Sequence, residues 1–178
     1  MMKKLSLITC VLVALTATVH AQETFAKRDI IGHVGIGIGG NISGSGYKIA
    51  FPPLLISGEY GVMEGLINGK GAIGVGGYLA YASDKYTGTD IKQSHVIFGA
   101  RGLFHYQFVD KLDTYAGLML GYESVSVSNN QSHFPVTGSD FLPGLFIGGR
   151  YYFTDRLAAF TELGYGIAFL QLGLAVRF

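Results

Sequence analysis

The sequence predicts an all-β fold, namely an eight-stranded antiparallel up-and-down transmembrane β-barrel. Three observations support this prediction. The last ten residues alternate between a wholly apolar face and a face of small or polar residues. Eight segments with this alternation follow one another between clusters of turn-forming residues. The charges within these segments fall on the glycine-bearing face, so we expect the apolar faces to contact lipid and the other faces to line a lumen.

The first half of the chain supplies four of these strands. The strand predicted at 30–40 alternates Ile and Val with glycine and His33. The strand at 53–63 starts at a proline pair, where a missing N–H is tolerated. The strand at 71–82 alternates Ile, Val, Leu and Tyr with glycine and alanine, and the strand at 95–108 alternates Val and Phe with glycine, arginine and histidine. Each segment is long enough to cross a bilayer as a tilted strand.

The second half supplies the other four strands. The segment 113–126 alternates Ala and Leu with Tyr and glycine, and 141–153 continues the pattern with Leu and Ile against glycine and arginine. The segment 157–166 follows a short turn at 154–156, and 169–178 closes the barrel. An even number of strands places both chain termini on the same side of the membrane.

The connections alternate in length, as expected for a membrane barrel. Short turns are predicted at 64–70, 109–112 and 154–156, and longer loops at 41–51, 83–94 and 127–140. The short turns would face the periplasm and the longer loops the outside. We expect the polar loops 83–94 and 127–140 to contact extracellular or envelope protein partners.

Residues 1–21 have the pattern of a secretory signal peptide. Two lysines precede an apolar run that ends near Val19, and a small-x-small cleavage pattern ends at Ala21. The apolar run is shorter than the roughly 20 residues of a membrane-spanning helix. Cleavage after Ala21 leaves 22–178 as the barrel domain, and this part contains no cysteine because the single cysteine of the chain is Cys10.

The composition excludes several classes of function. The chain is 49% hydrophobic and 14% charged and contains 27 glycines, which suits strands that face lipid. Lysine and arginine number 13 against 12 acidic residues, with no basic run, so no nucleic-acid partner is predicted. Without cysteine, the barrel domain has no disulfide framework and no thiolate metal site. The histidines show no metal-ligand spacing. We predict neither a cofactor nor a metal.

The predicted lumen contains the chemically distinctive residues of the chain. Six charged residues point inward in this prediction: Glu59, Arg101, Glu123, Arg150, Glu162 and Arg177. Inward polar residues are His33, Tyr78, His105, Tyr115 and Tyr152. The interior of an eight-stranded barrel is just wide enough for side chains to fill. We therefore predict a salt-bridged plug in which Arg101 and Arg150 pair with Glu59 and Glu162.

Two alternatives use the same residues. Two of the glutamates could act as the acid and base of a glycosidase, but neighbouring cations favour ionised carboxylates and the lumen has no room for a sugar. We therefore predict no catalytic residues. A soluble ligand-binding barrel of the lipocalin kind would have its apolar face inside and its charges outside. The pattern in this chain is the reverse.

The C-terminus carries a resemblance to a known family. Its alternating apolar residues resemble the C-terminal signature of bacterial outer-membrane barrels, which their insertion machinery recognises: Leu172, Leu174, Val176 and Phe178. Together with the strand number and the Arg/Glu lumen, this signature resembles small outer-membrane barrels of the OmpA/OmpX type. The resemblance covers 22–178. It implies a Gram-negative outer membrane, with outer-membrane lipid and the barrel-insertion machinery as partners.

The sequence leaves three functional hypotheses. The first is a structural and surface-display barrel with a plugged lumen, whose outer loops mediate interactions. The second is a narrow pore for ions or small solutes. The third is an outer-membrane lipid-modifying enzyme, suggested by His133 and Asp140 in the third loop. Fold alone does not choose among them.

Overall fold

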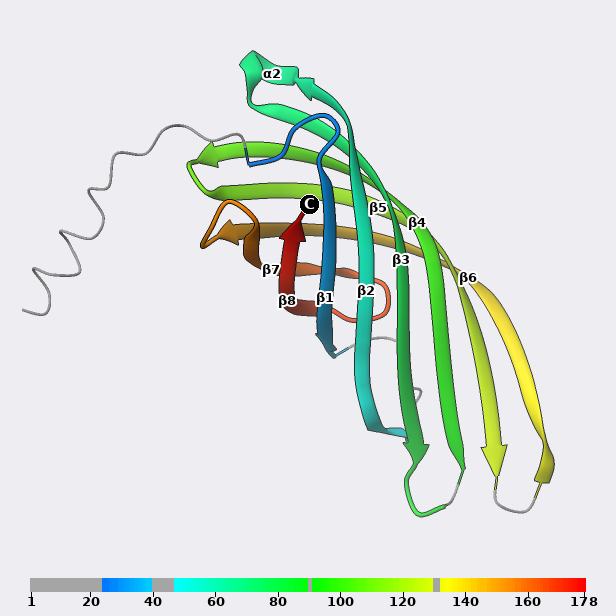
Figure 1. Ribbon diagram of the computed structural model, residues 1–178. Coiled ribbons are helices and arrows are strands. Elements are labelled where there is room, and N and C mark those ends of the chain that lie inside the picture. Colours follow the sequence, from blue (N-terminus) through cyan, green and yellow to red (C-terminus); the bar gives the residue numbers. More distant parts are fainter. Residues whose placement is uncertain (1–23, 40–46, 90, 130–131) are drawn as a thin grey trace, which may run out of the picture.

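The computed structural model describes residues 24–39, 47–89, 91–129 and 132–178, apart from the side chains of 129–137. The predicted signal peptide and the side chain of His133 lie outside this description. The chain forms eight strands (Figure 1): β1 (Ile30–Ile38), β2 (Tyr47–Gly65), β3 (Gly71–Tyr86), β4 (Lys92–Val109), β5 (Leu112–Asn129), β6 (Ser132–Tyr152), β7 (Leu157–Tyr165) and β8 (Leu170–Arg177). They pair antiparallel in chain order, and β1 closes on β8. The predicted eight-stranded barrel is confirmed.

Five strands are longer than predicted. The tracts 83–94 and 127–140, predicted as loops, belong mainly to β3, β4, β5 and β6, so that prediction is wrong. Pairing continues regularly through them, for example between Lys92 and Ser128. The polar composition of these tracts predicts loops. Polar residues here mark where the strands leave lipid, whereas the alternation of a strand continues beyond that level.

The two faces of the strands differ as the alternation predicts. On the outer face, Leu118 and Leu145 are 61% and 62% exposed. On the inner face, Ile31 and Arg150 are fully buried and lie among the side chains that fill the interior. The apolar outer surface extends around the whole barrel, which far exceeds the patch that a soluble monomer tolerates. This surface contradicts the soluble-barrel alternative.

The C-terminal signature residues are on the outer face. Leu172, Leu174, Val176 and Phe178 are all exposed, and β8 pairs with both β1 and β7. The side chain of Phe178 covers the outer side of Gly32, where an added Cβ would lie 3.3 Å from the Phe178 ring. The last strand therefore presents its apolar side outward while its pairing closes the barrel.

Two groups of exposed aromatic side chains mark the borders of the apolar surface. The outer girdle contains Tyr81, Phe98, Tyr122, Phe141 and Tyr165. The inner girdle contains the half-buried Tyr106 and the exposed side chains of Tyr60, Phe108, Tyr151, Phe153 and Phe178. On β4 the two girdles are about ten residues apart, or ~25 Å in height at ~3.3 Å per residue and a ~40° tilt. This is the height of the apolar band in outer-membrane barrels.

The barrel wall is uneven in height. Strands β1, β7 and β8 have eight or nine residues, whereas β2 to β6 have 16 to 21. Figure 1 shows the five long strands continuing past the short ones at the end opposite the chain termini. We call the part of β2 to β6 beyond the outer girdle the projecting sheet. At the other end, the turn between β2 and β3 contains the four-residue element α2 (Leu66–Gly69).

The described part of the chain includes no helix long and apolar enough to cross a membrane.

Candidate functional site

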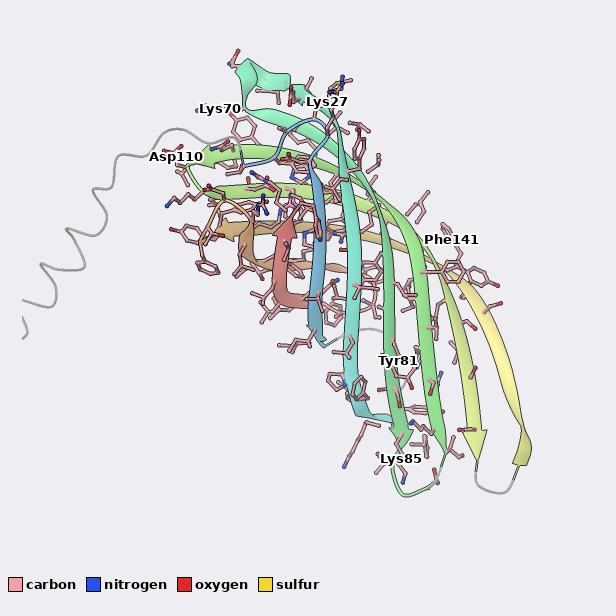
Figure 2. All side chains as sticks on the ribbon, viewed as in Figure 1. Lys27, Lys70, Tyr81, Lys85, Asp110 and Phe141 are labelled. Carbon is pink, nitrogen blue, oxygen red and sulfur yellow. The ribbon has the colours of Figure 1, made fainter. Side chains whose placement is uncertain are left out.

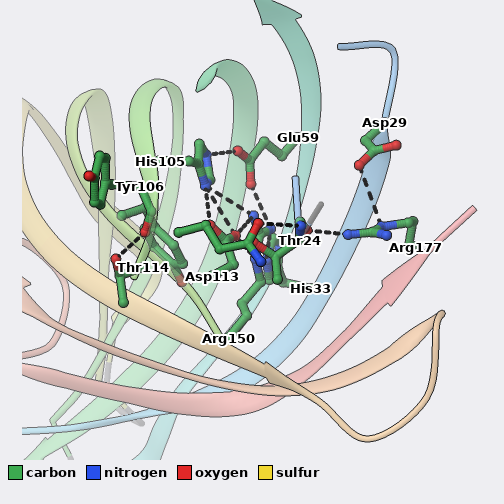
Figure 3. A network of polar contacts seen from close by, with 12 residues as sticks. Thr24, Asp29, His33, Glu59, His105, Tyr106, Asp113, Thr114, Arg150 and Arg177 are labelled. Carbon is green, nitrogen blue, oxygen red and sulfur yellow. Dashed lines mark hydrogen bonds and ion pairs between the residues drawn. The ribbon is translucent and has the colours of Figure 1, made fainter. Parts of the chain in front are cut away.

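The interior contains a charge cluster centred on Arg150 of β6 (Figure 3). Its Nε donates to Asp113 Oδ2 at 2.8 Å, and its Nη1 donates to Glu59 Oε2 at 2.8 Å. Its Nη2 also donates to Asp113. His33 Nε2 lies 3.0 Å from Nη1. One guanidinium on β6 thus contacts Asp113 of the neighbouring strand β5 and reaches across the lumen to His33 and Glu59 of the adjacent strands β1 and β2.

His105 of β4 completes this cluster. Its Nδ1 lies 3.0 Å from Asp113 Oδ1, and its Nε2 contacts Glu59 Oε1. The imidazole therefore lies between the same two carboxylates that Arg150 binds. All five charged or polar groups of the cluster are 7% exposed or less. Because these groups are buried, each depends on the others for its hydrogen bonds.

A second pair lies at another level of the lumen. Arg101 Nη2 is 2.8 Å from Glu162 Oε1, and the Tyr115 hydroxyl donates to the same oxygen at 2.9 Å. The Arg101 guanidinium lies over the Phe146 ring, 4.0 Å from its centroid, and 5.6 Å from that of Tyr78. The expected arginines and glutamates do meet, but as two separate pairs, Arg101 with Glu162 and Arg150 with Glu59.

The other two predicted lumen charges lie away from these pairs. Glu123 Oε1 is 2.7 Å from His95 Nδ1, and His95 Nε2 is 3.6 Å from Asp84 Oδ2, toward the projecting sheet. Arg177 lies at the inner mouth, where its Nε is 3.5 Å from Asp29 Oδ2. The six charges are therefore distributed among four groups along the lumen.

Tyr152 lies beside Arg177 at the inner mouth. The Arg177 guanidinium is 4.7 Å from the centroid of the Tyr152 ring. Arg177 also donates to the backbone carbonyl of Thr24, which ties the N-terminal segment to β8. All five predicted polar lumen residues are buried or nearly so.

The predicted lumen set does not include Asp113, His95 and Asp84, which are buried titratable residues. Asp113 has the same parity on β5 as Tyr115, but it is the first residue of the predicted strand 113–126, where the alternation only begins. His95 is likewise the first residue of the predicted strand 95–108, and Asp84 lies in the predicted loop 83–94. Continuing the period-two alternation by one or two residues at each strand end places all three inward.

The segment 24–29 enters the inner mouth of the barrel. The Phe25 ring stacks on the His105 imidazole with centroids 3.9 Å apart, and the Arg150 guanidinium is 5.3 Å from its centroid. The Arg28 N–H donates to the Gly61 carbonyl at 2.8 Å. An added Cβ at Gly61 would lie 2.0 Å from the Ala26 carbonyl oxygen, so only glycine permits this approach. This segment shows no periodic pattern in the sequence, so its position could not be predicted.

Space near the inner mouth is limited. Two hollows that Thr24 helps to line measure about 40 and 10 Å³. Volumes of this size hold only one or a few water molecules. Within the described residues, no group of three or more His, Cys, Asp or Glu side chains is arranged to hold a metal ion. The arrangement is suited to cross-linking the barrel wall from inside.

Comparisons with solved structures bear on the fold. The N-terminal β-barrel domain of Pseudomonas aeruginosa OprF is similar with a TM-score of 0.51 and 14% identity, over 86% of this chain and 100% of that one. Ail, the attachment invasion locus protein of Yersinia pestis, has a TM-score of 0.55 and 15% identity, over 85% and 97%. Ail in complex with the heparin analogue sucrose octasulfate has a TM-score of 0.57 and 13% identity, over 85% and 97%.

No protein-family model and no curated protein sequence matches the chain. At 13–15% identity, the structural similarity shows the fold alone. That fold is the one of small eight-stranded bacterial outer-membrane barrels, so the resemblance to the OmpA/OmpX type is confirmed at this level.

Proposed function

We infer that the protein is an outer-membrane barrel of a Gram-negative bacterium, exported through a cleaved signal peptide. In this proposal the charge network closes the lumen, and the projecting sheet is displayed at the cell surface for interactions. The projecting sheet is the observation that carries the proposal. It is a continuous antiparallel sheet beyond the outer girdle, where the sequence predicts loops.

The outer face of the projecting sheet has the chemistry of a surface in water. Above the aromatic side chains, the outward positions of β4, β5 and β6 are mainly serine: Ser94, Ser124, Ser126, Ser128 and Ser139. Between the outer and inner girdles, the outward positions of the same strands include Leu, Ile and Phe. This change within single strands supports a boundary between lipid and water at the outer girdle.

The projecting sheet also has an open edge. Among the described residues, β6 pairs with β7 only from Leu145 onward, although β6 begins at Ser132. Between Ser132 and Leu145, the backbone of β6 pairs with β5 on one side only. Such an edge presents N–H and C=O groups to which an extended peptide can add as a further strand. This supports extracellular or envelope proteins as partners.

Surface display predicts a specific labelling pattern on intact cells. The barrel domain lacks cysteine, so single cysteines can be placed at exposed sites: Ser128→Cys on the projecting sheet, and Asp110→Cys in the turn at the opposite end (Figure 2). We expect a membrane-impermeant maleimide to label Ser128→Cys on intact cells. Asp110→Cys should react only after the outer membrane is permeabilised. The reverse pattern would contradict the proposed orientation.

A closed lumen predicts little or no ion conduction. We expect the purified wild-type barrel to show no steady channels in planar lipid bilayers, because buried side chains and the segment 24–29 occupy the passage. An unrelated porin reconstituted in the same way provides the positive control. Steady unitary conductance of the wild-type protein would contradict the closed lumen and favour the narrow-pore alternative.

A further inference from the structure

An apolar groove of about 460 Å³ crosses the lipid-facing side of β4 to β7 at the inner girdle. Its floor is a row of small residues at facing positions on β5, β6 and β7: Thr114, Gly149 and Thr161. Its wall on β4 is aromatic and consists of Phe104, Tyr106 and Phe108. The adjoining outward positions on β6 carry the large side chains of Ile147 and Tyr151. The groove is therefore a local depression in the barrel wall, formed where small residues lie side by side.

The groove lies at the depth of the acyl chains of the inner leaflet. Phe108 belongs to the inner girdle, and Phe104 is four positions closer to the membrane centre, which is ~13 Å along the strand and ~10 Å in height at a ~40° tilt. One leaflet contributes about half of the ~30 Å hydrocarbon core. The volume is roughly 15 times the ~30 Å³ that one water molecule occupies in the liquid, and a methylene group is of similar size. The groove thus has room for most of one acyl chain.

Residues with hydroxyl groups lie at the interface end of the groove. Thr161 is exposed and belongs to the same row as Tyr106 of the inner girdle, through Thr114 and Gly149. The Thr114 hydroxyl donates to the Tyr106 backbone carbonyl, whereas Thr161 presents its hydroxyl on the lipid-facing side. A hydroxyl that meets only hydrocarbon loses a hydrogen bond. The ester carbonyls of a phospholipid lie at the level of the aromatic belt and can accept one, so this end of the groove suits a glycerophospholipid.

The turn beyond the groove complements a zwitterionic headgroup. Asp110 and Lys111 follow Phe108 within three positions, and both side chains are exposed. Figure 2 shows Asp110 at this end of the barrel, opposite the end that carries Lys85. A lysine ammonium binds phosphate as a point charge, and a carboxylate accepts hydrogen bonds from a primary ammonium. A phosphoethanolamine headgroup carries both a phosphate and a primary ammonium, whereas the quaternary ammonium of phosphocholine has no N–H to donate.

We propose that the groove on β4 to β7 binds an ethanolamine phospholipid of the inner leaflet, with one acyl chain against Gly149 and its headgroup at Asp110 and Lys111. This site rests on the proposed outer-membrane location, which makes the inner girdle the periplasmic border. Lipid chains are as apolar as the groove, so hydrophobic burial does not select a bound lipid over the surrounding ones. Selection comes from packing against the aromatic wall and from the headgroup contacts.

The test uses the full barrel in nanodiscs of phosphatidylcholine that contain a small fraction of phosphatidylethanolamine. Native mass spectrometry after release from the nanodisc measures the phosphatidylethanolamine that the barrel retains. We expect Gly149→Leu to lower this retention about tenfold, for which the loss of about ten optimal carbon–carbon contacts is enough. An added Cβ at Gly149 would lie 3.7 Å from the Asp113 carbonyl oxygen, an ordinary contact, so this variant should fold. The matched control is Gly77→Leu, the same change on the lipid-facing side of β3 outside the groove, which should retain the lipid like the wild type.

A further variant, Asp110→Asn, tests the headgroup. Relative to their abundance, it should retain the two phospholipids alike, whereas the wild type should prefer phosphatidylethanolamine. Equal phosphatidylethanolamine retention by the wild type and Gly149→Leu would overturn the proposal, as would equal retention of both headgroups by the wild type. A dimer that disappears in Gly149→Leu would assign the groove to a second copy of the chain and overturn it as well. Cysteine labelling of intact cells does not depend on this groove, so a failure of the outer-membrane proposal would be seen separately.

Discussion

Replacing Arg150 with methionine is expected to lower the free energy of unfolding of the barrel by about 3–5 kcal/mol. The substitution keeps an unbranched side chain of similar length but removes the hydrogen bonds to Glu59 and Asp113. Glu59 and Asp113, which are 5% and 1% exposed, would then share only the His105 imidazole as a partner within the cluster. Urea titration of the protein in phospholipid vesicles, followed by circular dichroism and gel mobility, measures the change.

Two further variants separate the charge effect from a general effect of substitution. Arg156→Met lies in the exposed turn before β7 and should change the free energy of unfolding by less than about 0.5 kcal/mol. The triple variant Arg150→Met/Glu59→Gln/Asp113→Asn removes the buried charges together. We expect it to recover part of the stability lost by Arg150→Met. Unchanged urea resistance of Arg150→Met would show that the cluster does not stabilise the barrel.

The face of each strand could be predicted from the sequence, whereas the pairing of charges in the lumen could not. Period-two alternation is a property of each strand alone. It therefore predicts that Arg101 and Glu162 point into the lumen, whichever strands lie beside them. Their contact depends on the stagger between strands, which puts Arg101 opposite Gly76 and Glu162 opposite Gly148. Because glycine has no side chain, Gly76 and Gly148 leave room in the lumen for the long side chains of Arg101 and Glu162.

The strand ends and the N-terminal segment could not be predicted for different reasons. Polar, serine-rich composition predicts that a strand ends, although β-pairing does not require apolar residues. Phe25 lies in a short polar lead with no period, so nothing local indicates that it stacks on His105. Its position is set by the shape of the inner mouth, which exists only after the strands have paired.

Gly76 and Gly77 are neighbours in β3 and lie on opposite faces of the strand. We therefore expect the same substitution to have opposite effects at the two positions. An added Cβ at Gly76 would lie 2.3 Å from the Gly58 carbonyl oxygen and 3.3 Å from Glu59 Cα. Both atoms are backbone of the paired strand and cannot move without disturbing it. We expect Gly76→Val to cost at least about 2–3 kcal/mol of unfolding free energy, or to prevent folding into vesicles.

Gly77→Val is the matched control, in the same strand and between the same neighbouring strands. No atom lies within 4 Å of its added Cβ, which points away from the lumen. We expect this variant to fold and to gain about 0.5–1 kcal/mol, because valine suits a strand better than glycine and its methyl groups enter hydrocarbon. Refolding yield and urea titration in vesicles compare the two. An equal loss from both substitutions would contradict the assignment of one face to the crowded lumen and the other to lipid.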